Sequence, residues 1–370
     1  MNIPLKTHES PVGDIVSPGL EGVIAAETVL SHVDGAAGRL VLRGHELEQL
    51  RDWSFEAVLA LLWRDLAPES CDETEIRARL GVARVAAFAR MTAALPALDG
   101  LSEIEGLRLL LSRLPDAETE SHHVVAVAAV PVFAAAVIRR ARGLAPVPPD
   151  PAVGHAADFL RMLHGAEQGP EKVRALDTYL VTVADHGLNA STFAARVIAS
   201  TQAGLFSSVI GGLCALKGPL HGGAPGPVLD MLDAIGAEDN IQPWLVASLD
   251  RGERLMGFGH RIYRVRDPRA DALKRAVAGL RDTGGRIAFA EKVEQQALAL
   301  LAERKPLRSL QTNVEFYTAL LLEAVGFPRE SFTNVFAAGR MAGWTAHVLE
   351  QDKVGRLIRP QSRYVGPIPA

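Results

Sequence analysis

The stretch from Gly257 to Arg269 (GFGHRIYRVRDPR) holds the densest set of side chains that could act on a substrate. Its one histidine, His260, stands among four arginines. Guanidiniums this close repel one another unless anions lie beside them, and arginine binds carboxylates and phosphates through paired hydrogen bonds. Histidine exchanges a proton near neutral pH. The stretch therefore predicts a site for an anionic small molecule, although a solvated basic turn before a helix has the same composition.

Two further histidines stand beside glycine or asparagine rather than on apolar helix faces. His186 lies in the run DHGLNAST, and His221 lies in the run KGPLHGGA. A lone histidine is most often structural, but Gly222 and Gly223 let the backbone come close to a ligand. The three histidines lack the close paired spacing of metal ligands, so no metal site is expected.

One acidic residue and two arginines complete the candidates. Glu315 lies in the first turn of a helix that Asn313 is expected to cap and Gly326 to end. The helix dipole favours acids there, whereas a general base would need burial to raise the pKa that the dipole lowers. Arg340 lies among Ala and Gly on an expected buried helix, so its charge must be paired or bind an anion. Arg359 lies in a Pro-containing tail.

The composition restricts the class of protein. A chain of 370 residues is long enough for a large and a smaller domain, and 48% apolar with 22% charged residues is typical of globular proteins. The net charge of -4 argues against nucleic-acid or membrane binding through bulk charge, so any anion site must be local. Cys71 and Cys214 form no metal or redox spacing, and the start of the chain has no apolar signal segment. We expect a soluble, cytoplasmic protein.

The elements that position these residues are predicted to be nearly all helical. Within 20–45, Asp34-Gly35 between β-branched residues predicts a small β-hairpin. The Ala-, Ser- and Gly-rich segment 185–217 indicates closely packed helices, and 225–329 carries four or five shorter ones. The uncharged run Val124–Ile138 is too short to span a bilayer and predicts a buried helix. Apolar residues recur at helical spacing in 55–66, 73–95, 102–114, 122–141, 152–163 and 334–350.

Taken together, these motifs resemble those of the citrate synthase family, including 2-methylcitrate synthases, over essentially the whole chain. The length is similar to that of the short bacterial and archaeal type. The resemblance implies a mainly α, multi-helical, two-domain fold with a small N-terminal β-hairpin, assembled as a homodimer. Residues 1–223 and 330–370 would form the large domain, and 224–329 a small mobile domain. The matching segments are 20–50, 185–192, 218–224, 257–269, 313–317, 340–350 and 359–366.

The resemblance also implies a role for each candidate. Glu315 would be the base that removes a methyl proton from the acyl-CoA, and His221 would donate to the enolate oxygen. His260 would polarise the ketone of oxaloacetate and protonate the new alkoxide. The CoA phosphates match Arg264, to which we add Arg266. No permanently bound cofactor is expected, and acyl-CoA is a co-substrate. Oxaloacetate would be held by His186, His221, His260, Arg269, Arg340 and, from the neighbouring subunit, Arg359.

One departure from the family leaves three functions open. The base is usually aspartate, and Glu315 is longer by one methylene, so its carboxylate must be re-aimed by about an ångström, a misplacement that can cost ~10²-fold in rate. The first function is citrate synthesis from acetyl-CoA, oxaloacetate and water through citryl-CoA, as in the tricarboxylic acid cycle. The second is 2-methylcitrate synthesis from propionyl-CoA. The third is a CoA- and dicarboxylate-binding relative with little turnover.

Overall fold

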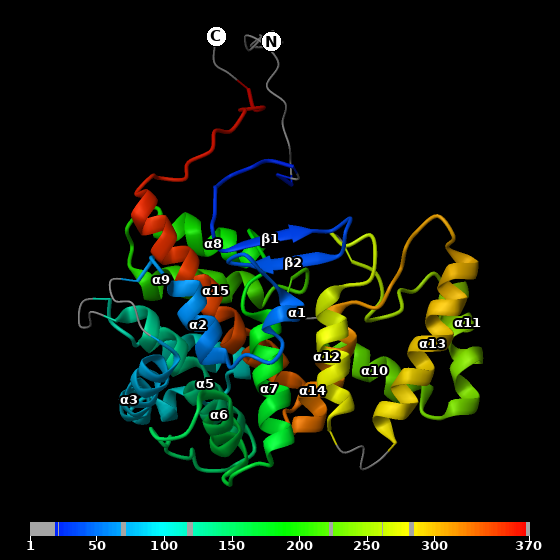
Figure 1. The fold of residues 1–370 in the computed structure, drawn as a ribbon, viewed down its shortest axis with the longest axis horizontal. Helices are drawn as coiled ribbons and strands as arrows, with labels where there is room; N and C mark the ends of the chain where they lie inside the picture. The colour runs from blue at the N-terminus through cyan, green and yellow to red at the C-terminus, as the bar shows by residue number, and fades with distance from the viewer. Residues whose placement is uncertain are drawn as a thin grey trace, which may run out of the picture.

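The computed structural model describes residues 19–20, 22–67, 72–116, 121–221, 225–260, 262–280 and 285–367. A small antiparallel sheet lies near the N-terminus, and helices make up most of the rest (Figure 1). Strand β1 (Ser31–Asp34) pairs with β2 (Arg39–Leu42), which pairs with β3 (His45–Glu46). The chain turns after Asp34, as predicted, and the Asp34 carboxylate accepts hydrogen bonds from the N–H groups of Ala36 and Ala37. The predicted hairpin and the mainly α fold are confirmed.

The helices follow the sheet in chain order. Three short 3₁₀ helices, η1 (Leu95–Leu98), η2 (Glu238–Asn240) and η3 (Arg329–Ser331), lie between them. The α-helices are α1 (Leu47–Leu50), α2 (Phe55–Trp63), α3 (Glu73–Thr92), α4 (Glu103–Leu111), α5 (His122–Ala141), α6 (His155–His164), α7 (Pro170–Val183), α8 (Ala190–Ala199), α9 (Leu205–Leu216), α10 (Pro225–Ile235), α11 (Ile241–Asp250), α12 (Pro268–Ala278), α13 (Arg286–Arg304), α14 (Val314–Val325) and α15 (Phe332–Val354).

Helix α15 is the element against which most of the larger lobe packs, because it contacts α2, α5, α7, α8 and α9. Small residues allow a close approach to the end of α7. A Cβ atom at Gly343 would lie 2.5 Å from the Ala184 carbonyl oxygen, and the Gly343 N–H donates to that oxygen at 2.9 Å. The expectation of closely packed helices around Arg340 is confirmed, and the packing brings Arg340 to the loop that follows α7.

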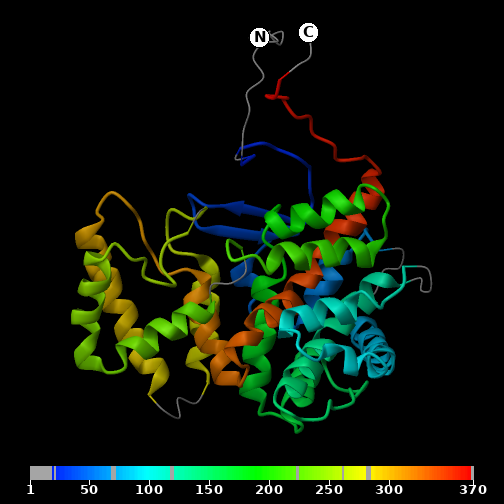
Figure 2. The same cartoon turned by 180° about the vertical axis from the view of Figure 1, so that it is seen from behind.

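A smaller lobe containing α10, α11 and α13 lies beside the larger one (Figures 1 and 2). Helices α12 and α14 connect the two lobes, because both pack against α7 of the larger lobe and against each other, and α14 also packs against α10 of the smaller lobe. An ion pair between Arg275 on α12 and Glu48 on α1 adds to this contact. The division into residues 1–223 with 330–370 and residues 224–329 stays a prediction.

One feature differs from the helices predicted from sequence. Helix α7 was not predicted, although it contacts α6, α12, α14 and α15. Pro170 occupies its first turn, where a missing N–H costs nothing. The segment 185–217 forms two helices, in agreement with the helices expected there, and the second begins after Gly204.

Helix α5 contains the uncharged run that predicted a buried helix. Among the described residues it is the one helix long and apolar enough to cross a membrane, and it is mostly buried inside the protein. Core helices of soluble proteins meet the same criterion. The prediction that this run forms a buried helix is confirmed, with Val124 and Ile138 both in the core.

Candidate active site

His260 lies in a loop that is held against the start of α14. The Asn313 N–H donates to the Gly257 carbonyl at 2.9 Å, and Asn313 Nδ2 donates to the Gly259 carbonyl at 2.8 Å. The same Asn313 side chain accepts from the Glu315 N–H at 3.0 Å, which is the predicted helix cap. A single asparagine therefore fixes both the histidine loop and the first turn that carries Glu315.

Arg269 is fixed beside His260 by a carboxylate. Asp267 accepts from Arg269 Nε at 3.0 Å and from Nη2 at 2.8 Å, a two-point contact between buried groups. The guanidinium also lies over the Tyr263 ring, 5.6 Å from its centroid. Burial of the guanidinium is tolerated because Asp267 compensates its charge. Arg269 Nη2 then reaches to 3.1 Å from His260 Nε2.

The hydrogen bonds around His260 assign its proton. The backbone N–H groups of Ile262 and Tyr263 both lie within about 3.1 Å of Nδ1, at 3.0 and 3.1 Å, so Nδ1 is the acceptor. A neutral imidazole then carries its proton on Nε2, beside the Arg269 guanidinium, which is also a donor. Burial, with Arg269 next in effect, lowers the pKa of His260 to about 4. His260 Nε2–H and Arg269 Nη2 are therefore two neighbouring hydrogen-bond donors, an arrangement that binds an acceptor oxygen.

His186 joins this group from the loop after α7. Its ring centroid lies 6.0 Å from that of His260, and its Nε2 lies 3.1 Å from the Tyr263 hydroxyl. Burial, followed by the charges of Arg269 and Arg340, lowers the pKa of His186 well below its ordinary value. His186 is therefore neutral at pH 7.

Arg340 lies at the centre of the arrangement, 1% exposed on α15. Its Nε donates to the Val183 carbonyl at 2.7 Å, and its guanidinium lies 4.9 Å from the Phe336 ring centroid. Burial lowers its pKa to about 10, so it stays charged at pH 7. Its charge lowers the pKa of both His186 and His221, because a nearby cation disfavours the imidazolium.

His221 is held by Ser191, in the first turn of α8. His221 Nε2 lies 2.8 Å from Ser191 Oγ, and Ser191 Oγ accepts from Trp344 Nε1 at 3.2 Å. Burial, followed by Arg340, lowers the pKa of His221 to about 4, so the imidazole is neutral. The adjacent Gly222 and Gly223, which sequence singled out, lie outside the described residues.

Glu315 has the protonation behaviour of a base poised near neutral pH. Burial raises its pKa to about 7, against the charge of Arg269, which lowers it. Asp267 adds a smaller effect that raises it. Burial therefore outweighs the favourable position at the start of α14. The structure brings together six predicted residues, which we call the site cluster: His186, His221, His260, Arg269, Glu315 and Arg340.

The raised pKa of Glu315 gives a test in pH. A base works when deprotonated, so kcat/KM should rise with pH, about tenfold per pH unit below 7, and level off above about 7. His221 and His260 titrate near 4 and leave this limb unaffected. Initial rates in buffers of constant ionic strength between pH 5 and pH 9 measure the profile. A rate that is flat from pH 5.5 to pH 8.5 would contradict the assigned base.

Three predicted arginines lie outside the site cluster. Arg264 is exposed on the His260 loop. Arg266 pairs with Asp271 on α12 and with Glu294 on α13, at 2.5 and 3.1 Å. The segment after α15 carries Arg359 exposed and extends away from the helices (Figure 1). The roles predicted for these arginines stay predictions, and the ion pairs of Arg266 favour a structural role.

Four residues of the site were not assigned from sequence, although all lie inside the quoted motifs. Tyr263 and Asp267 come from the His260 stretch, and Asp185 and Ser191 come from the His186 stretch. Tyr263, Asp267 and Ser191 each lie within hydrogen-bonding distance of a site residue. Asp185 directly precedes His186. The signal available was a polar residue within a motif that contains a candidate histidine.

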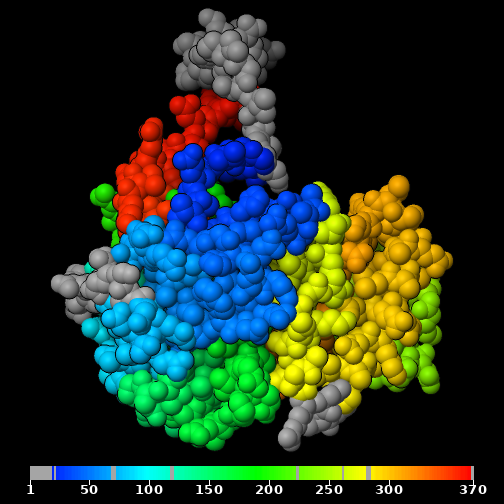
Figure 3. All heavy atoms as spheres, viewed as in Figure 1, coloured from blue at the N-terminus to red at the C-terminus, as the bar shows by residue number. Residues whose placement is uncertain are grey.

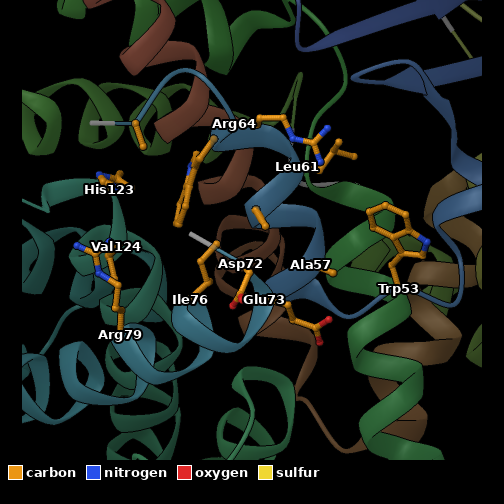
Figure 4. A pocket seen from close by; sticks show the side chains of 13 residues that line it. Trp53, Ala57, Leu61, Arg64, Asp72, Glu73, Ile76, Arg79, His123 and Val124 are labelled. Carbon is orange, nitrogen blue, oxygen red and sulfur yellow. The ribbon is translucent and has the colours of Figure 1, made fainter. Parts of the chain in front are cut away.

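A hollow of ≈ 360 Å³ lies elsewhere, between α2, α3 and α5 (Figure 4). It contains no member of the site cluster. Within the described ranges, no group of three His, Cys, Asp or Glu side chains is arranged to hold a metal ion. The residues lining the hollow include Trp53, Ala57, Leu61, Ile76, His123 and Val124.

Comparisons with known proteins point to one family. A family profile described as "Citrate synthase, C-terminal domain" matches residues 19–361. Citrate synthase from Haloferax volcanii is 39% identical over 371 residues, covering 94% of this chain and 95% of that protein. A 2-methylcitrate synthase from Mycobacterium tuberculosis is 34% identical, covering 95% of this chain and 91% of that protein.

Solved structures agree with the sequence relatives. The crystal structure of citrate synthase from Thermotoga maritima is 35% identical with a TM-score of 0.83, covering 96% of this chain and 97% of that chain. A ternary complex of carboxymethyl coenzyme A and oxaloacetate with citrate synthase from Thermoplasma acidophilum is 26% identical with a TM-score of 0.86. It covers 97% of this chain and 98% of that chain.

Proposed function

The chain belongs to the citrate synthase family, and from that premise we propose that it condenses acetyl-CoA with oxaloacetate and water to give citrate and CoA through citryl-CoA. It is an acyltransferase-type enzyme, as its family membership requires. A solved relative binds oxaloacetate together with a CoA analogue. The observation that carries the proposal for this chain is the convergence of three neutral histidines, two buried arginines and a carboxylate in the site cluster.

We propose that Arg269 and Arg340 bind the carboxylates of oxaloacetate, with His186 beside them. Both guanidiniums are buried and charged, so a carboxylate of the dianion placed beside each of them would form charge-assisted hydrogen bonds with it. The N–H of His260 Nε2 and Arg269 Nη2 donate to the ketone oxygen. Both donors draw electrons from the carbonyl carbon and stabilise the alkoxide that forms there.

The acyl-CoA is activated by a base and a neutral donor. Glu315 removes a proton from the methyl group, and its pKa of about 7 suits it to accept that proton. His221 donates to the enolate oxygen. Ser191 Oγ lies 2.8 Å from both Asn189 Oδ1 and His221 Nε2, so its one hydroxyl proton can be donated to either acceptor. In the proposed mechanism Ser191 donates to His221 Nε2, so that the neutral imidazole carries its proton on Nδ1 and donates it to the thioester oxygen.

A thiol-release assay with oxaloacetate and either acetyl-CoA or propionyl-CoA tests the function. We expect CoA release with acetyl-CoA at a higher kcat/KM than with propionyl-CoA. The reverse order would assign the chain to 2-methylcitrate synthesis, a second candidate supported by the 34% identical relative. Oxaloacetate binding without CoA release from either thioester would indicate a binding relative with little turnover.

The assembly and the subunit roles belong to the same proposal. We propose a cytoplasmic homodimer in which residues 224–329 form a mobile domain and Arg359 completes the partner's oxaloacetate site. Support comes from the exposed tail, in which Arg359 contacts no member of the site cluster of its own chain within the described residues. Mixed dimers of Arg359→Ala and His260→Ala chains test this. They contain one complete site only if Arg359 acts across the interface, so mixtures without regained activity would refute the sharing.

A further inference from the structure

The β1–β2 hairpin touches both loops that carry the oxaloacetate histidines. Its first strand begins at Ser31, beside the loop of His186, and its turn at 35–38 lies against the loop of His260 (Figure 1). In the space-filling view, the blue atoms of the hairpin region adjoin the yellow atoms of α12 and of the loop before it (Figure 3). The two contacts lie at opposite ends of β1, a four-residue strand that is paired with β2 along its whole length.

At the first end, Ser31 binds both residues that flank His186. Its Oγ accepts from the Gly187 N–H at 2.9 Å and donates to Asp185 Oδ2. Asp185 is fully buried, and its carboxylate lies 3.3 Å from His347 Nε2. A hydroxyl with both its donor and acceptor functions engaged in this way holds the loop in one position.

At the second end, the turn presses on the backbone of the His260 loop. The Arg264 N–H donates to the Gly35 carbonyl at 2.8 Å. A Cβ atom at Gly35 would lie only 2.4 Å from the Ile262 carbonyl oxygen, so this close contact requires glycine. At Gly38, a Cβ atom would lie 2.6 Å from Val265 Cγ2.

The two loops also meet directly, because Tyr263 from one binds His186 of the other at 3.1 Å. We propose that the hairpin is a spacer that sets the separation of His186 and His260, with Ser31 and Gly35 as positioning residues for oxaloacetate. This inference rests on the proposed function. Neither residue belongs to the site cluster, so each acts on binding only through the histidine loop that it holds.

The substitution Gly35→Ala tests the spacer. The added methyl group must push the Ile262 backbone away, and with it the His260 loop. Because displacements of about 1 Å can cost 10²-fold in rate, we expect the oxaloacetate Kd to rise at least about tenfold. Calorimetric titration of the full-length protein with oxaloacetate measures it. Ala36→Ser is the matched control, since Ala36 is an exposed neighbour in the same turn, and it should bind like the wild type.

A second variant acts at the opposite end. Ser31→Ala removes both hydrogen bonds to the His186 loop and should weaken oxaloacetate binding about three- to tenfold, the effect of one or two such bonds. Thermal unfolding of each variant separates positioning from stability, because a merely structural residue would lower the midpoint and leave the Kd of the folded protein unchanged. If both variants bind oxaloacetate with wild-type affinity, the spacer inference is wrong and the proposed function is unaffected. A wild-type protein that binds no oxaloacetate would overturn the proposed function as well.

Discussion

Glu315→Gln is expected to lower kcat with acetyl-CoA by about 10²- to 10⁴-fold, the contribution typical of a general base. The amide keeps the size of the side chain but cannot take the methyl proton. Burial raises the pKa of Glu315 to about 7, which makes its carboxylate basic enough to accept a proton near neutral pH. The substitution removes that basic group. Oxaloacetate affinity should change little, because the arginines and histidines proposed to bind it remain. Steady-state kinetics with calorimetric binding separate the two effects.

Two further variants sharpen this result. Glu103→Gln is the matched control, because burial also raises the pKa of Glu103 to about 7, on α4 and outside the site cluster. Its kcat should equal that of the wild type. Glu315→Asp shortens the base by one methylene and should change the rate by re-aiming the carboxylate. If Glu315→Gln and Glu315→Asp both turn over at the wild-type rate, another group is the base.

Arg340→Met is expected to weaken oxaloacetate binding by about 10²-fold or more. Truncating one partner of a buried charge pair typically costs 2–5 kcal/mol, or about 30- to several-thousand-fold in affinity. Methionine fills much of the same volume over Phe336, so packing is largely kept. Removing the cation also removes a charge that lowers the pKa of His186 and His221, so both pKa values should rise.

Arg340→Lys distinguishes charge from geometry at the same position. Lysine keeps the positive charge but loses the planar fork and the Nε bond to the Val183 carbonyl, so its affinity should lie between those of wild type and Arg340→Met. Calorimetry gives the affinities, and thermal unfolding shows whether each variant is folded at the temperature used. A folded Arg340→Met that binds oxaloacetate as tightly as the wild type would remove Arg340 from the substrate site.

Local signals in the sequence were sufficient for individual elements. The Asn313 cap and the Gly326 end of α14 follow from short-range rules, and both are present. Asp34-Gly35 predicted the hairpin turn for the same reason. Helix α7 was missed because β-branched residues such as Val173 and Thr182 have modest helix propensity, and packing against α15 outweighs it.

The geometry of the site depends on contacts between distant residues, which no local rule describes. Tyr263 binds His186 across 77 positions, and Ser31 binds the Asp185 loop across 154. The cluster of four arginines predicted one anion site, but the structure divides it. Arg269 faces His260, while Arg266 pairs with Glu294 on α13. Composition alone does not distinguish an arginine that binds substrate from one that binds a neighbouring helix.

The last long helix, α15, carries two residues one turn apart that serve the two halves of the proposed reaction. Arg340 reaches the oxaloacetate side of the site cluster, and Trp344 donates to Ser191, the partner of His221. Any substitution that rotates or slides α15 would therefore disturb dicarboxylate capture and enolate formation together. Engineering a different acyl-chain preference should accordingly avoid this helix and begin with residues whose movement affects only the thioester.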